Sequence, residues 1–181
     1  MDHLFNTRKF ILFHSTKKDN ISKIIKASDF ISSNSDYEWL ANGVYFWDNM
    51  INAKWWTEKR GFKNDAVIYK CLIKCPEINY LDLDILENTL AYNNFIRDFY
   101  LNYSSNKSLY DENIKEFNLK NRIEARKFFI NFFCEKNNIY LVKRTFYYND
   151  KKHKGLLEIP RTQFCVIDGY QDKLIKNMEV L

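Results

Sequence analysis

Short apolar runs separated by polar segments predict strands in the first part of the chain. Residues 9–13, a lysine followed by four apolar or aromatic residues, predict a buried strand that ends at His14. Gly43–Trp47 predicts a second strand, and residues 66–75 alternate apolar and polar side chains up to Pro76, as in a strand with one buried face. A short strand over residues 79–83 completes this sheet-forming region.

Two helices are predicted between these strands. Ile21, Ile24 and Ile25 recur at helical spacing after a possible cap at Asp19 or Asn20. The segment after residue 47 begins with another possible cap, at Asp48 or Asn49. It continues with the helically spaced residues Ala53, Trp56 and Lys59.

Apolar residues recur every three or four positions from about 84 to 136 and predict a mainly helical insertion. Strand composition returns over 138–148, a polar tip follows over 149–155, and segments 156–159 and 163–167 predict the final strands. The expected fold class is therefore α+β, with strands at both ends of the chain around a helical insert.

Composition sets limits on the class of protein. The chain has 181 residues, of which 46% are hydrophobic, enough for a single domain spanning 1–181. The N-terminus lacks a secretory signal and no apolar run approaches the roughly 18 residues of a membrane span, so we expect a cytoplasmic protein that does not enter a membrane. Its four cysteines are expected to be reduced thiols, and the C-x3-C spacing of Cys71 and Cys75 argues against zinc.

Positive charge is unevenly distributed, although the net charge is only +5. Lysine and arginine concentrate at positions 17–18, 120–127, 143–144 and 151–154. A solvated surface explains these groups more simply than a dedicated nucleic-acid surface, while contact with phosphate stays open as the alternative.

The residues with candidate chemistry lie in three separate segments. His14-Ser15-Thr16 follows the first predicted strand, and Tyr45-Phe46 lies in the second, with Ala53-Lys54-Trp55 shortly after it. A third segment, residues 163–168, begins with glutamine and reads Gln-Phe-Cys-Val-Ile-Asp. Together these segments resemble the NAD-binding signature of ADP-ribosyltransferases of the poly-ADP-ribose-polymerase and diphtheria-toxin branch.

That resemblance implies a fold and a set of roles. The fold would be a split pair of small β-sheets with flanking helices, and NAD would be the co-substrate, with no metal. His14 would bind the adenosine ribose, while Ser15 and Thr16 would lie beside the nicotinamide amide. Tyr45 and Trp55 would sandwich the nicotinamide ring, with Phe46 next to them.

Two positions depart from the family pattern. Ser15 stands where the family has glycine, which adds a side chain near the amide pocket. Gln163 stands where the family has the catalytic glutamate, so it lacks the negative charge that polymer elongation uses, and we do not expect a polymerase. Glu158 could replace it if residues 159–162 form a turn over the pocket, and Arg161 could bind an NAD phosphate.

The leading hypothesis is a mono-ADP-ribosyltransferase enzyme that transfers ADP-ribose from NAD to a nucleic acid, RNA included, or to a protein. Its size and composition resemble bacterial or phage-related toxins, including those of toxin–antitoxin and anti-phage defence systems, so a neutralising antitoxin protein is a further expected partner. A catalytically silent NAD- or ADP-ribose-binding module and a nucleic-acid-binding protein are the alternatives.

Overall fold

Seven β-strands and four α-helices make up the described part of the chain, which is therefore α+β. The computed structural model describes residues 6–24, 26–32, 39–105, 122–149 and 158–181. The strands are β1 (Thr7–Lys17), β2 (Gly43–Trp47), β3 (Ala66–Pro76), β4 (Tyr80–Asp82), β5 (Leu141–Asn149), β6 (Glu158–Ile167) and β7 (Ile175–Val180). The helices are α1 (Met50–Lys59), α2 (Leu86–Ser105), α4 (Arg122–Asn137) and the single turn α5 (Gln171–Leu174).

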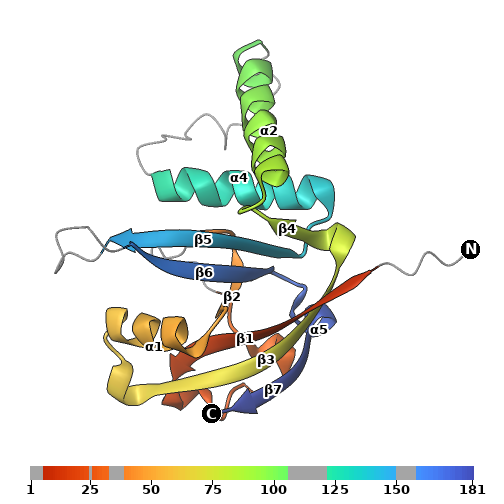
Figure 1. Cartoon of the computed structure of the whole chain (residues 1–181). Helices are drawn as coiled ribbons and strands as arrows, with labels where there is room; N and C mark the ends of the chain where they lie inside the picture. The colour runs from red at the N-terminus through yellow and green to blue at the C-terminus, as the bar shows by residue number, and fades with distance from the viewer. Residues whose placement is uncertain (1–5, 25, 33–38, 106–121, 150–157) are drawn as a thin grey trace, which may run out of the picture.

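The seven strands form one sheet, in which they lie side by side in the order β4-β5-β6-β2-β1-β3-β7. All neighbours are antiparallel except β4 and β5, which are parallel and are joined through α2 and α4. β1 pairs with β3 along its whole length, but it meets β2 at one register pair, Phe13 opposite Trp47. The sheet therefore consists of two halves, β4-β5-β6-β2 and β1-β3-β7, that diverge beyond this pair (Figure 1).

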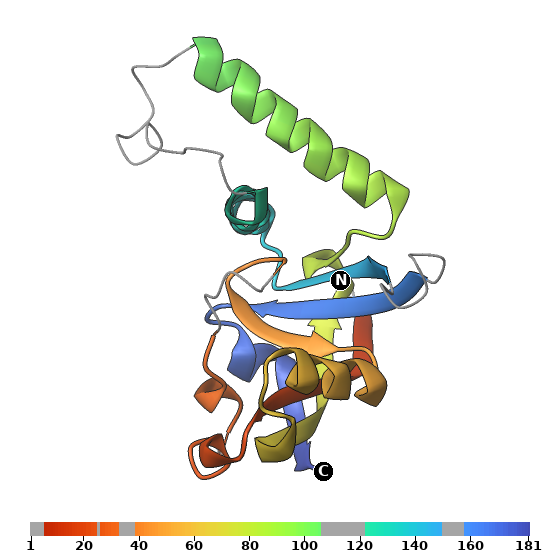
Figure 2. The ribbon, with the colours of Figure 1, turned by 90° about the vertical axis from the view of Figure 1, so that its left-hand side faces the viewer.

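Both faces of the β5-β6-β2 half are buried, which the alternation of side chains along β6 shows directly. Phe164 and Val166 belong to a core shared with β1 and β3, whereas Cys165 belongs to a second core. The first core lies between the two halves of the sheet and includes Leu12 and Ile73. The second core lies beneath the helices α2 and α4, which are stacked on the other face (Figure 2).

The mainly helical insertion predicted over residues 84–136 is confirmed by α2 and α4, while residues 106–121 lie outside the described part. Helix α4 contributes Phe129, Ile130 and Phe133 to the second core. Helix α2 packs on α4 through rings such as Phe95, whose centroid lies 5.3 Å from that of Phe133. Figure 2 shows that α2 extends away from the sheet.

Helix α1 and strand β3 follow the sequence prediction closely. The Asn49 side chain caps α1 by accepting a hydrogen bond from the backbone N–H of Asn52 at 2.8 Å. β3 alternates buried and less buried residues and ends at Pro76. Residues 150–155 of the predicted polar tip lie outside the described part, as do residues 156 and 157 of the strand predicted after it.

Three predicted elements differ from the structure. β1 continues past His14 to Lys17, because its pairing with β3 extends to Lys17 opposite Ala66. The helix predicted from residue 19 is instead a 3₁₀ turn, Lys18–Asn20, followed by further turns. The turn predicted at 159–162 is wrong, because β6 runs unbroken through these residues and pairs with β5 along them.

No helix in the described ranges is both long enough and apolar enough to cross a membrane. The four cysteines are free thiols buried in the interior. Burial raises the pKa of Cys71, Cys75 and Cys134 to about 12, so these thiols stay protonated near neutral pH.

Candidate functional site

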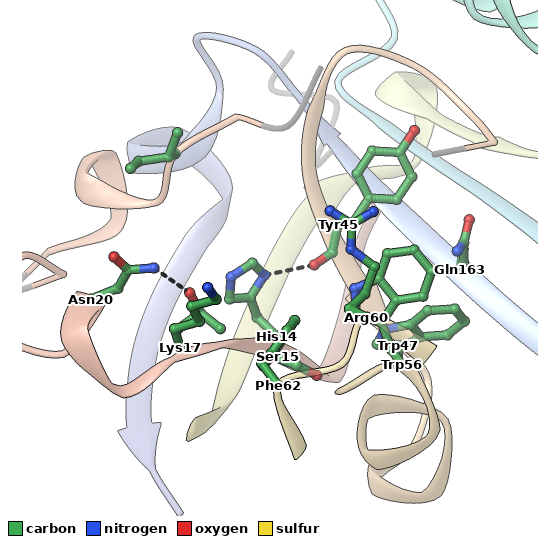
Figure 3. A pocket seen from close by; sticks show the side chains of 12 residues that line it. His14, Ser15, Lys17, Asn20, Tyr45, Trp47, Trp56, Arg60, Phe62 and Gln163 are labelled. Atoms are coloured by element: carbon green, nitrogen blue, oxygen red, sulfur yellow. Dashed lines mark hydrogen bonds between the residues drawn. The ribbon is translucent and has the colours of Figure 1, made fainter. Parts of the chain in front are cut away.

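A cavity of about 280 Å³ opens where β1 and β2 separate beyond their single register pair. β1 contributes residues 14–17 to its wall, and β2 contributes Tyr45 and Trp47. Trp56 and Arg60 come from α1 and its C-terminal cap, and Gln163 comes from β6. Figure 3 shows these side chains around the cavity. The divergence of the two half-sheets thus creates the site and brings residues from both ends of the chain together.

His14 connects the two diverging strands through its ring. Its Nδ1 lies 2.8 Å from the backbone carbonyl oxygen of Tyr45, and because a carbonyl only accepts, Nδ1 carries the proton and donates (Figure 3). Burial of the imidazole lowers the pKa of His14 to about 4, against the opposing effect of this hydrogen bond. The ring is therefore neutral at pH 7, and its Nε2 is a hydrogen-bond acceptor.

Ser15 and Thr16 both line the cavity, and both have hydroxyl groups engaged in local contacts. The Ser15 hydroxyl donates to the backbone carbonyl oxygen of Ala53 at 2.9 Å, which ties β1 to α1. The Thr16 hydroxyl accepts from the Asn20 side chain at 2.7 Å. The Ser15 side chain is thus directed to α1 by its hydrogen bond.

The Tyr45 ring is held in place by its hydroxyl group. That hydroxyl donates to the Ala41 carbonyl oxygen at 2.8 Å and accepts from the Leu40 N–H at 3.0 Å. Its neighbours in β2, Val44 and Phe46, point into the first core instead. The chain segment before β2 therefore fixes the position of one aromatic wall of the cavity.

Trp56 lines the cavity, whereas Trp55 is not among the lining residues. The Trp56 ring lies 5.7 Å from that of Trp47, also in the wall, and the Arg60 guanidinium lies 5.4 Å from its centroid. Trp55 packs instead against Arg161 and Tyr148. Adjacent residues of a helix point about 100° apart, so only one of these two tryptophans reaches the cavity.

Gln163 lies in the cavity wall and is only 1% exposed. Within the described part of the chain, its Oε1 is buried and has no hydrogen-bond partner. The residue pairs with Trp47 of β2 and with Arg144 of β5 in the sheet register. An unpaired buried carbonyl oxygen costs stability, so Gln163 holds an unsatisfied acceptor in a residue of the cavity wall.

Three other predicted site residues lie outside the cavity lining. Phe46 is fully buried in the first core, against the rings of His14 and Phe30. Arg161 is 6% exposed, donates from Nη1 to the Asn52 side chain and lies 4.5 Å from the Trp55 ring. Glu158 is exposed at the start of β6, five residues before Gln163, or roughly 17 Å away along an extended strand.

Sequence reasoning missed several lining residues, notably Arg60, Asn20, Ile31 and Phe62. One signal was available for Arg60, because it follows Trp56 by four residues and thus shares its side of the helix. The others reach the cavity from turns whose position depends on the tertiary fold. Among the described residues, no group of three His, Cys, Asp or Glu side chains is placed to hold a metal ion.

Comparison with known proteins gives one partial similarity. No family model matches the chain, and no solved structure matches it. The chain is 31% identical over 90 residues to an uncharacterized protein, MJ0359, from the archaeon Methanocaldococcus jannaschii. The match covers 46% of this chain and 42% of that protein, so the chain spans less than half the length of the relative it matches.

Proposed function

We propose that the protein is a mono-ADP-ribosyltransferase that cleaves NAD and transfers one ADP-ribose to a macromolecule. The observation that carries the proposal is the presence of His14, Tyr45 and Gln163 in the wall of one cavity, although 149 positions separate the first residue from the last. The two diverging half-sheets support the finer fold assignment to the split-sheet architecture of these transferases.

The size of the cavity fits part of the dinucleotide. Its volume, about 280 Å³, lies just below the roughly 300–1,000 Å³ typical of pockets that enclose a drug-sized ligand. It would therefore enclose the nicotinamide and its ribose, while the adenosine half extends along β1 towards His14 and Lys17. The aromatic walls formed by Tyr45 and by Trp47 with Trp56 would hold the flat nicotinamide ring.

The polar groups of the wall define the chemistry. The neutral His14 ring would accept a hydrogen bond from a ribose hydroxyl at Nε2, since Nδ1 donates to the Tyr45 carbonyl oxygen. The Gln163 Oε1 would accept a hydrogen bond from the second ribose, beside the bond that breaks. Positive charge develops on that ribose as nicotinamide leaves, and a neutral amide stabilises it less than a carboxylate would. We therefore expect the protein to transfer ADP-ribose slowly, one unit at a time.

The test measures nicotinamide released from NAD by the purified protein with cell lysate as the source of acceptor. Tyr45→Leu removes the aromatic wall and should abolish release. Tyr45→Phe keeps the ring but loses the hydroxyl bonds to Leu40 and Ala41 that hold it in place, so it should retain more activity than Tyr45→Leu. Absence of nicotinamide release from the natural protein would refute the proposal.

A silent NAD-binding module is the second candidate, because the residue in the glutamate position is uncharged. It predicts that NAD binds, as measured by calorimetry, and that Tyr45→Leu weakens binding while nicotinamide is never released.

If transfer occurs, incubation with labelled NAD followed by separate protease and nuclease digestion identifies whether the acceptor is a protein or a nucleic acid.

A further inference from the structure

Beside the cavity lies a cluster of three aromatic rings and two cations, which we call the α1–β5 cluster: Trp55, Trp56, Tyr148, Lys59 and Arg60. The Trp55 centroid lies 5.6 Å from Tyr148 and 6.3 Å from Trp56. The Lys59 Nζ lies 4.9 Å from the Tyr148 centroid and donates to its hydroxyl at 3.1 Å. The cluster thus joins the C-terminal half of α1 to the far end of β5.

The burial of α1 is unusual for a helix that only packs on a sheet. Its buried residues are Asn52, Ala53 and Thr57, which are small or polar, while its two tryptophans stay partly exposed. Burial of a large ring contributes far more to folding than burial of these residues, so packing alone would favour the opposite arrangement. Partly exposed rings beside the mouth of a cavity indicate a binding surface.

The charge of this surface is positive. The two cations of the cluster, Lys59 and Arg60, are exposed, the first on α1 and the second at its C-terminal cap. The neighbouring Glu58 carboxylate lies 2.6 Å from the Lys63 ammonium and interacts more weakly with Lys59, so the exposed cations near it outnumber this carboxylate. An anionic partner is therefore favoured, and rings interleaved with cations are how proteins bind single strands, by stacking on bases and attracting phosphates.

We propose that the α1–β5 cluster binds a single-stranded nucleic acid. A duplex hides the faces of its bases and would not use the rings, and an acidic peptide would need only the cations. Trp56 and Arg60 belong to both the cluster and the cavity wall, so a bound strand would run past the cavity mouth. That this strand is the acceptor of ADP-ribose rests on the proposed function, whereas the binding itself does not.

The test is fluorescence anisotropy of labelled DNA and RNA single strands of about 12 nucleotides, within the site sizes of known single-strand binders. The full chain is used without NAD. Binding should weaken steeply between about 50 and 200 mM salt. Tyr148→Ala should lower the affinity at least about fivefold, the lower range for loss of one stacked base. Lys59→Gln should lower the affinity and reduce the salt dependence.

Tyr147→Ala is the matched control, because Tyr147 is the next residue of β5, is 66% exposed and belongs to the opposite side of the strand. It should change the affinity less than about twofold, and circular dichroism should show that all three variants are folded. Equal loss in both tyrosine variants would overturn the proposal.

Three further results would also overturn it: no binding of either strand at low salt, equal or tighter binding of the matching duplex, and equal competition by poly-glutamate. Because these measurements contain no NAD, failure of nicotinamide release would leave a positive binding result standing. Conversely, nicotinamide release without strand binding would refute only this inference.

Discussion

The buried side-chain amide of Gln163 should lower the stability of the fold and contribute to the proposed activity. Its Oε1 has no partner among the described residues, which costs about 1–3 kcal/mol. Gln163→Leu replaces the amide with an apolar side chain of similar size. We expect the free energy of unfolding, measured with urea, to stay the same or rise by about 1 kcal/mol. Nicotinamide release should fall at least about tenfold.

Gln163→Glu provides the contrasting variant. A carboxylate in this position lacks a described partner, so the free energy of unfolding should fall. Its negative charge should raise nicotinamide release above that of the natural protein, most strongly at alkaline pH, where a buried carboxyl group is ionised. The proposed role of Gln163 fails if the leucine and glutamate variants release nicotinamide at the same rate.

The lowered pKa of His14 predicts that the stability of the fold depends on pH. Its pKa is lowered by burial from 6.5 to about 4, so the unfolded chain binds the proton more tightly than the folded protein does. The resulting stability is fully present above pH 6.5 and is lost as the pH falls from 6.5 towards 4, by up to about 3 kcal/mol. Urea unfolding at pH 7 and pH 5 measures the loss.

The control is His14→Asn, because an amide N–H can still donate to the Tyr45 carbonyl and does not titrate. The natural protein should lose more stability between pH 7 and pH 5 than this variant, whose remaining loss reports the other titrating groups. Identical losses in the two proteins would show that His14 is not the group responsible.

Among the elements, β2 depends on the close approach of its first residue to β6. A Cβ atom placed on Gly43 would lie 2.1 Å from the backbone oxygen of Val166, and backbone cannot easily move away. We therefore expect Gly43→Ala to lower the free energy of unfolding by about 1–3 kcal/mol or more, measured by urea denaturation. Gly43 thus has a packing role at the start of β2.

Gly61→Asn tests whether the loss at Gly43 is specific to packing. Gly61 has a φ of +73°, and no atom of the described residues lies within 4 Å of the place that a Cβ atom would take. Asparagine tolerates this left-handed backbone conformation. The variant should therefore change stability by less than about 0.5 kcal/mol. A comparable loss at both glycines would contradict the packing argument.

The elements that the sequence predicted correctly are those with strong local signals. The Asn49 cap of α1 and the alternation that ends at Pro76 in β3 are examples, since each lies in a few consecutive residues. The unbroken β6 could not be predicted, because Pro160 usually ends a strand. In the structure β2 pairs only with residues 163–167 of β6, so Pro160 has a single neighbouring strand, β5. A proline, which lacks the backbone N–H, is tolerated where a strand is paired on one side only.

The candidate site was likewise predicted in part, where local patterns in the sequence were sufficient. The positions of His14, Tyr45 and Gln163 on strands followed from local patterns, and the structure brings these residues together. The choice of Trp56 over Trp55 depends on how α1 is rotated about its axis, which the hydrogen bond from Ser15 to Ala53 helps to fix. No local pattern contains that information.

At the scale of the whole molecule, the two cores share the strands between them. Val142 and Cys165 belong to the core under α4, while Leu141 and Phe164 belong to the core between the half-sheets. Neighbouring residues of the same strands thus stabilise both cores. Loss of one core removes the support of the other, so we expect the described part of the chain to unfold in one cooperative transition.

Ile130→Ala tests this coupling from the helical side. Ile130 of α4 is fully buried, so the truncation should cost about 2–5 kcal/mol, whereas Leu90→Ala on the exposed side of α2 should cost less than about 0.5 kcal/mol. Tryptophan fluorescence reports mainly the cavity region, since three of the four tryptophans lie in β2 and α1, while far-ultraviolet circular dichroism reports mainly α2 and α4. Both signals should shift to the same lower urea midpoint in Ile130→Ala. A loss of helix signal that precedes the fluorescence change would instead show that α2 and α4 unfold independently, with the cavity left intact.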